Sequence, residues 1–105
     1  MRVELHPGAE QVLLDAAAFY EREVSPALAA RYVAEFERVA ALLLANPGLG
    51  TPRTRGRRGF PTMNFPYTLI YREIAFGIRV PVVKHDRRRP GYGGSRRLDA
   101  GSARR

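Results

Sequence analysis

Apolar residues in the first half of the chain recur at spacings of three and four positions, as they do in amphipathic helices. The first predicted helix runs from Ala9 to about Glu23. Its apolar face is expected to comprise Val12, Ala16, Phe19 and Tyr20, with Leu13 beside them. Charged residues occupy the other side, so we expect one face of this helix to lie in a core.

A second helix is predicted directly after the first. Ser25 suits the N-cap position, and Pro26 suits the first helical position, where its missing N–H would have no partner. The apolar stripe of this helix consists of Ala29, Tyr32, Phe36, Val39, Ala40 and Leu43. Asn46-Pro47-Gly48 ends it near Ala45. Because the link between the helices is short, they should form an antiparallel hairpin.

The other apolar segments have the character of strands. Residues 2–6 alternate and stop at Pro7-Gly8, which predicts a short first strand. Residues 46–59 are rich in Gly, Pro and Arg and are expected to form a loop. The remaining strands are predicted over 60–65 (weak), 67–72 (strong) and 76–83, with a tight connection at 73–75. Pro81 predicts an irregularity in the last strand, because proline cannot donate to a neighbouring strand.

The predicted order is therefore β-α-α-β-β-β, an α+β fold. Its small, antiparallel-rich sheet should be covered on one face by the helical hairpin, with the other face open. A chain of 105 residues has room for one domain. We expect this domain to comprise residues 1–92, and residues 93–105 to form a basic, disordered tail.

Charge is distributed unevenly along the chain, whose formal net charge is +8. Residues 1–50 carry four arginines and seven acids, whereas residues 51–105 carry fourteen Lys and Arg and three acids. Such asymmetry predicts one basic face and a negatively charged partner.

Several classes of chemistry lack the residues that they need. Without cysteine there is no disulfide or thiolate metal site, and the two histidines lie far apart in the sequence. No phosphate-binding loop, signal peptide or membrane-spanning segment is visible. We therefore expect a cytoplasmic protein that uses no cofactor or metal and contacts no membrane.

Four segments, taken in their order and spacing, resemble the RelE/ParE superfamily of toxins from type II toxin–antitoxin systems. They are residues 15–21 and 30–36 in the predicted helices, 65–72 (FPYTLIYR) and 83–92 (VKHDRRRPGY). The last two are closest to ParE-like and plasmid-stabilisation proteins. The resemblance covers residues 1–92 and implies a toxin that inhibits growth until an antitoxin binds it.

The superfamily contains two mechanisms, and the resemblance implies one of them. ParE-like members inhibit DNA gyrase by binding it, whereas RelE-like members cleave mRNA on the ribosome without a metal. In the nuclease pattern an arginine stands where this chain has Thr68. We therefore expect gyrase inhibition first and mRNA cleavage as the alternative. A third possibility is a non-toxic basic binding protein with the same fold.

The candidate site residues follow from these alternatives. A nuclease would need an acid, a base and cations for the phosphate. Arg88 and Tyr92 match the nuclease pattern, and His85 is the nearby side chain that titrates close to neutral pH. The candidates for binding a target or nucleic acid are Arg53, Arg55, Arg57, Arg58, Arg72, Arg87, Arg88, Arg89 and Tyr92.

The expected partners are a cognate antitoxin and a target, which is DNA gyrase or, alternatively, the ribosome with its mRNA. The antitoxin should be acidic and should fold as it binds over the basic sheet face and the helical hairpin.

Overall fold

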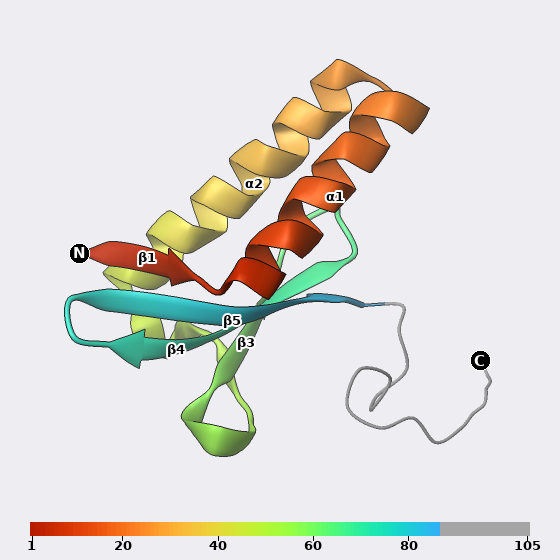
Figure 1. The fold of residues 1–105 in the computed structure, drawn as a ribbon. Coiled ribbons are helices and arrows are strands. Elements are labelled where there is room, and N and C mark those ends of the chain that lie inside the picture. The colour runs from red at the N-terminus through yellow and green to blue at the C-terminus, as the bar shows by residue number, and fades with distance from the viewer. Residues whose placement is uncertain (87–105) are drawn as a thin grey trace, which may run out of the picture.

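Residues 1–86, which the computed structural model describes, form two long helices and one five-stranded sheet (Figure 1). The elements in chain order are β1 (Arg2–Leu5), α1 (Pro7–Glu23), α2 (Pro26–Ala45), the 3₁₀ turn η1 (Pro47–Leu49), β2 (Thr51–Pro52), the 3₁₀ turn η2 (Thr54–Gly56), β3 (Arg58–Pro61), β4 (Tyr67–Ile74) and β5 (Gly77–His85). The predicted α+β class and order of elements are confirmed, with β2 as an additional strand.

The sheet has the order β1-β5-β4-β3-β2. β1 runs parallel to β5, and all other neighbours are antiparallel. Figure 1 shows α1 and α2 packed side by side over one face, while the β2–β3 hairpin extends away from them. No helix within residues 1–86 is long and apolar enough to cross a bilayer.

The core lies between the helices and the sheet. The buried side chains that form it come from both helices and from β4 and β5: Ala9, Val39, Leu43, Leu69, Tyr71, Ile78, Val80 and Val83. Alternate residues of β4 and β5 therefore face the helices, as expected for a half-buried sheet.

Local sequence signals determine the helix ends. The Ser25 side chain accepts a hydrogen bond from the Leu28 N–H at 3.1 Å, which confirms the predicted N-cap of α2. α1 begins at Pro7, two residues before the predicted Ala9. Its N-cap is His6, whose Nδ1 accepts from the Gly8 N–H at 2.9 Å.

The predicted apolar face of α1 is wrong in part. Val12 is 37% exposed and Phe19 is 50% exposed, whereas Ala9, Leu13 and Ala16 are buried. The buried face is centred near Leu13, so Val12 and Phe19 lie on its flank. The stripe predicted for α2 is buried except for Phe36, which is half-buried against the core.

The predicted loop over residues 46–59 contains regular structure. It holds η1, β2, η2 and the first two residues of β3. β2 is only two residues long and is defined by its pairing with β3, at Thr51↔Gly59 and Pro52↔Arg58. The strand predicted over 60–65 is also wrong in part, since β3 covers Arg58–Pro61 and the chain then leaves the sheet.

β5 contains the predicted irregularity at Pro81. The register with β4 shifts by one residue between the pairs Ile70↔Val82 and Arg72↔Arg79. The extra residue on β5 lies beside Pro81, where a missing N–H donor is best tolerated. Val83 and His85 consequently lie on the helix side of the sheet, and Val82 and Lys84 on the other side.

The turn between β4 and β5 lies two residues later than predicted. Ile74 pairs with Gly77, so the turn residues are Ala75 and Phe76. Phe76 has a φ of 65° and is 82% exposed. A left-handed backbone conformation is sterically unfavourable for a residue with a bulky side chain, and burial of the Phe76 ring does not offset this cost.

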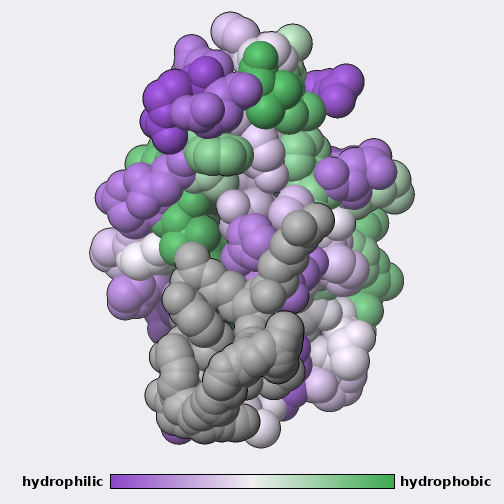
Figure 2. All heavy atoms as spheres, turned by 90° about the vertical axis from the view of Figure 1, so that its right-hand side faces the viewer, coloured by the Kyte–Doolittle hydropathy of each residue, from purple (hydrophilic) through white to green (hydrophobic). Residues whose placement is uncertain are grey.

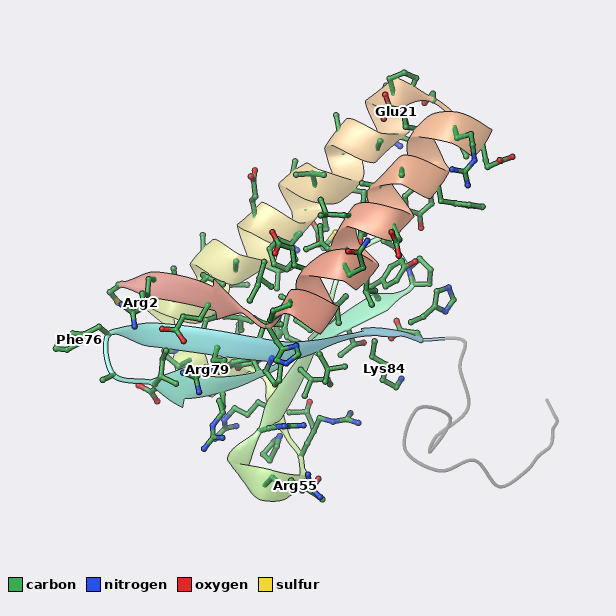
Figure 3. All side chains as sticks on the ribbon, viewed as in Figure 1. Arg2, Glu21, Arg55, Phe76, Arg79 and Lys84 are labelled. Carbon is green, nitrogen blue, oxygen red and sulfur yellow. The ribbon has the colours of Figure 1, made fainter. Side chains whose placement is uncertain are left out.

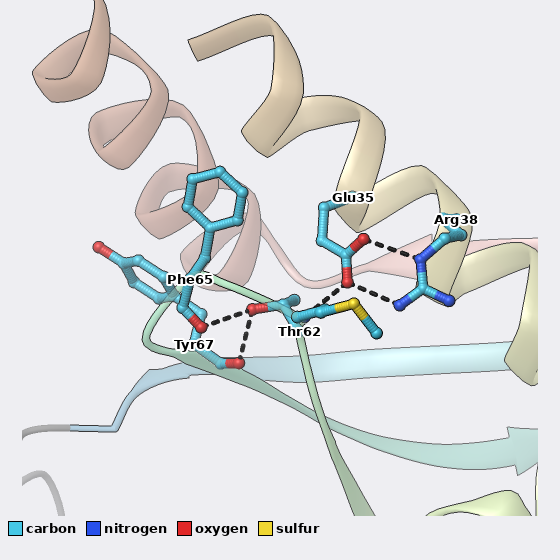
Figure 4. A network of polar contacts seen from close by, with 6 residues as sticks. Glu35, Arg38, Thr62, Phe65 and Tyr67 are labelled. Carbon is cyan, nitrogen blue, oxygen red and sulfur yellow. Dashed lines mark hydrogen bonds and ion pairs between the residues drawn. The ribbon is translucent and has the colours of Figure 1, made fainter. Parts of the chain in front are cut away.

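A polar clamp fixes the connection between β3 and β4 (Figure 4). Glu35 of α2 accepts hydrogen bonds from the Met63 N–H at 2.6 Å and from the Arg38 guanidinium at 2.7 and 2.8 Å. The Thr62 hydroxyl contacts the carbonyl oxygens of Phe65 and Tyr67 at 3.0 and 2.9 Å. The hydrogen bond from Arg38 is the main reason that the pKa of Glu35 lies below its usual value.

Replacing Phe76 by glycine should raise the free energy of unfolding by about 1 kcal/mol, because glycine adopts positive φ without a steric cost. Urea unfolding of Phe76→Gly and the wild type measures the change. Ala75→Gly is the matched control, because Ala75 does not have a positive φ. A less stable Phe76→Gly protein would show that the turn is not strained.

Replacing Glu35 by glutamine should lower the free energy of unfolding at pH 7 by about 1 kcal/mol, because the charge-assisted hydrogen bonds are lost. The pKa of Glu35 is depressed in the folded state, so its contribution is complete above its unfolded pKa and disappears as pH falls through the folded value. Urea titrations at pH 7 and pH 3 should therefore show the two proteins converging in acid. Glu37→Gln, at an exposed position on the same helix, is the control. A difference that persists at pH 3 would contradict the linkage.

Candidate functional site

The sheet face opposite the helices carries most of the charged strand residues. The register places the following residues on it: Arg2, Glu4, Thr51, Gly59, Pro61, Thr68, Ile70, Arg72, Ile74, Arg79, Val82 and Lys84. Arg53 and Arg57 join this set, because the Arg53 N–H donates to the Arg57 carbonyl at 2.8 Å and so extends the β2–β3 pairing by one step. We call the surface formed by all of these residues, including Arg53 and Arg57, the open face.

Positive charge predominates on the open face. It holds six cationic side chains, Arg2, Arg53, Arg57, Arg72, Arg79 and Lys84, and one acid, Glu4, with Asp86 at its border. Figure 3 shows Arg2, Arg79 and Lys84 spread along β1 and β5, and Arg55 at the far tip of the hairpin.

Only part of this charge is paired. Glu4 accepts from Arg79 at 2.9 and 3.1 Å and from Arg2 Nε at 2.8 Å. These bonds, with that from Arg79 the largest cause, hold the pKa of Glu4 below its usual value. Asp86 accepts from the Thr68 hydroxyl at 2.6 Å. Within residues 1–86, Arg53, Arg57, Arg72 and Lys84 form no ion pair.

Gly59 forms the floor beneath Arg53. A Cβ at Gly59 would lie 3.1 Å from Arg53 Cδ, 3.4 Å from Ile70 Cδ1 and 3.5 Å from Thr68 Cγ2. The absence of a side chain thus lets the aliphatic stem of Arg53 lie flat on the sheet. Covering by such stems accounts for the burial of Ile70 on a face that no helix covers.

Arg57 is the least satisfied member of the face. Its Nε is buried and has no hydrogen-bond partner among the described residues. A buried donor on a charged group normally has an acceptor, because leaving it unpaired costs free energy.

Tyr71 anchors the hairpin that carries these arginines. Its ring is fully buried, and its hydroxyl donates to the Pro47 carbonyl at 2.7 Å and accepts from the Gly50 N–H at 2.8 Å. A Cβ at Gly50 would lie 2.7 Å from that hydroxyl, so only glycine fits. Arg58 strengthens the anchor by donating to the Gly50 carbonyl at 2.9 Å.

The predicted binding residues therefore divide into three groups. Arg53, Arg57 and Arg72 lie together on the open face. Arg55 is exposed at the tip of the hairpin, with a φ of 63°, and Arg58 points to the helix side and has a structural hydrogen bond. Arg87, Arg88, Arg89 and Tyr92 lie outside the described residues, as do the predicted tail and the domain boundary at residue 92.

His85 does not lie with the arginines of the open face. It pairs with Tyr67 across β4 and β5, and the two rings meet edge to face at 5.0 Å on the helix side of the sheet. Tyr67 also contacts the ring of Tyr32, whose pKa is raised by burial. Tyr67 and Tyr71 therefore both pack on the helix side of the sheet.

Arg2, Arg79 and Lys84 were not among the candidates predicted from sequence. Arg79 stands opposite Arg72 in the β4–β5 pair, and Lys84 stands opposite Thr68. Strand alternation alone would have found Arg79, but Lys84 reaches this face only through the bulge at Pro81. No three His, Asp or Glu side chains of residues 1–86 come close enough together to hold a metal ion.

A second surface feature lies over the helices. Val12, Leu14, Phe19 and Val24 of α1 and its link are exposed, and Arg22 lies over the Phe19 ring at 6.0 Å. Figure 2 shows hydrophobic patches among hydrophilic side chains in the upper, helical part of the view.

Comparisons with known proteins agree with the fold and the sequence pattern. The profile of the family described as ParE toxin of type II toxin–antitoxin system, parDE, matches residues 3–90. The chain belongs to this ParE toxin family, and membership implies an antitoxin as partner.

One similar solved structure comes from a study described as the chromosomal ParDE TA system from P. aeruginosa. Its matched chain is 20% identical, with a TM-score of 0.69 over 81% of this chain and 95% of that one, and supports the fold. No curated protein matched this chain in the sequence comparison.

Replacing Tyr71 by phenylalanine should lower the free energy of unfolding by about 1–3 kcal/mol, because the Gly50 N–H and the Pro47 carbonyl lose their shared partner. Urea unfolding measures the loss. The matched control is Tyr20→Phe, since Tyr20 packs by its ring and its hydroxyl makes no hydrogen bond within residues 1–86. Equal stabilities of Tyr71→Phe and the wild type would show that the hydroxyl does not anchor the hairpin.

Proposed function

We propose that this protein inhibits growth by binding DNA gyrase and blocking it stoichiometrically, and that its antitoxin neutralises it. The observation that carries the proposal is the composition of the open face. Within residues 1–86 this face presents cations, the Thr68 hydroxyl and the hydrogen-bonded carboxylates of Glu4 and Asp86, whereas His85 packs against Tyr67 on the other side of the sheet.

Metal-independent RNA cleavage needs a group that accepts the 2′-hydroxyl proton and another that protonates the leaving oxygen. His85 could act in this way only if it reached the same surface as the phosphate-binding cations. Thr68, which replaces an arginine of the nuclease pattern, is engaged with Asp86 at 2.6 Å. A cationic face that lacks His85, and whose carboxylates Glu4 and Asp86 are already hydrogen-bonded, favours binding over catalysis.

The same surfaces suit an acidic antitoxin. The unpaired cations Arg53, Arg72 and Lys84 would attract its carboxylates. The exposed Val12 and Phe19 on α1 would take apolar side chains of a segment that folds on binding. Such a partner would shield the charge and the apolar surface together.

Induced expression without the antitoxin should lower DNA synthesis early, while protein synthesis continues. Pulse labelling of both processes in parallel measures the order. In a supercoiling assay with purified gyrase, Arg72→Glu should inhibit about tenfold less well than the wild type, because it reverses a charge at the centre of the open face. Arg31→Glu makes the same charge change on an exposed position of α2 and should inhibit normally.

An early fall in translation with cut mRNA would contradict gyrase inhibition and support the nuclease alternative. In that case His85, Arg88 and Tyr92 become the residues to replace first. If neither process falls, the protein is a non-toxic binding protein with this fold.

A further inference from the structure

We propose that the open face binds the phosphate backbone of duplex DNA, independently of base sequence, at a site centred on Arg57. This inference rests on the proposed function only for its biological use: DNA binding would let the toxin contact gyrase while the enzyme holds DNA. Its physical basis is the open face itself.

The first argument is the unsatisfied guanidinium of Arg57. Its Nε is buried without a partner among the described residues, whereas Arg79 on the same face pairs with Glu4. The Arg57 side chain as a whole is only partly buried, so a phosphate at the surface would balance the charge of this guanidinium. The positive charge of Arg57, which no acid of residues 1–86 pairs with, therefore favours an anionic ligand.

The second argument is the number and arrangement of cations. Arg53, Arg72 and Lys84 are also without ion pairs within residues 1–86, and they lie on the hairpin, on β4 and on β5, respectively. Four such charges spread over a sheet match a polyanion better than a single ion. Phosphate contacts of this kind position a duplex without reading its bases.

The third argument concerns the kind of nucleic acid. Proteins that bind single strands stack the bases on aromatic side chains. On the part of the open face that the structure describes, the register places no aromatic side chain: its uncharged members are Thr51, Pro61, Thr68, Ile70, Ile74 and Val82, while Tyr67, Tyr71 and Phe60 face the helices. Cations without a stacking platform favour a duplex, whose bases are already stacked internally.

Gly59 allows Arg53 to take part in the proposed contact with DNA. Because it has no side chain, the stem of Arg53 lies against Ile70 and Thr68 and leaves its guanidinium at the surface. A side chain at this position would press against the Arg53 stem, which lies beside Arg57 across the hairpin.

The test measures binding of the full chain to a fluorescent 20-base-pair DNA duplex by anisotropy, without gyrase, between 50 and 300 mM salt. A protein with a net charge of +8 attracts DNA in any case, so the decisive comparison is between variants of equal charge. Arg57→Met and Arg72→Gln should bind about five- to tenfold more weakly, and each should reduce the salt slope by about 1. Arg31→Gln, on α2, should bind like the wild type.

Arg57→Met provides a second readout, because it removes an unpaired buried donor. Its urea midpoint should equal or exceed that of the wild type, while its DNA affinity falls. Lower stability with unchanged DNA binding would show that Arg57 is structural and would overturn the proposal. If this variant does not fold, Arg72→Gln at its exposed position decides the question alone.

Other outcomes also overturn the inference. Equal affinities of all three variants would place DNA binding outside the open face. Tighter binding of single-stranded RNA or DNA of the same length would assign the face to a single strand. Equally tight binding of a poly-glutamate peptide of matched charge would assign it to an acidic protein. Because the assay contains no gyrase, failure here and failure of gyrase inhibition are separate results.

Discussion

The hydroxyl group of Tyr71 is the contact on which the arrangement of the molecule depends. Its ring belongs to the core beneath the helices, and its oxygen joins the Pro47 carbonyl to the Gly50 N–H. One side chain thus connects the sheet, the end of α2 and the start of the β2–β3 hairpin. Since the hairpin carries Arg53 and Arg57, the packing of the core sets the geometry of the open face. The rest of that face follows from strand alternation, because each residue between two core residues of β4 points away from the helices.

The sequence was sufficient to predict the structure where a local pattern and the tertiary packing agree. The N-cap at Ser25, the stripe of α2 and the aromatic β4 are such cases. The sequence was insufficient where contacts with a distant segment, such as a neighbouring strand, decide the local structure. Thr51 and Pro52 form a strand only because β3 lies beside them, and apolar residues on two sides of α1 left the centre of its buried face ambiguous. The site shows the same limit, since simple alternation would place Arg79, Pro81, Val83 and His85 on one face. The bulge moves His85 to the helix side and brings Lys84 to the open face.

Two local features of the described chain cost stability without an evident structural return. Phe76 keeps a left-handed backbone while remaining exposed, and Arg57 keeps a buried donor without an acceptor. Glycine at the first position and an apolar residue at the second would each serve the fold better. They lie on the sheet layer and its turn, whereas the helix layer has satisfied caps and clamps such as Ser25 and Glu35. Unfavourable local choices of this kind are found disproportionately at functional surfaces of proteins.

The two layers also differ in charge, and this difference determines how the protein meets a partner. Residues 1–50, which include both helices, carry four arginines and seven acids, whereas residues 51–86 carry seven Lys and Arg and two acids. The described part of the chain is therefore acidic on one layer and basic on the other. A charge separation of this kind turns the molecule as it approaches a polyanion, so that the open face arrives first. The helices then face away, and their exposed apolar side chains stay accessible to a second partner. Under the proposed function, an acidic antitoxin would gain most by spanning both layers, because shielding the open face alone would leave that apolar surface in water.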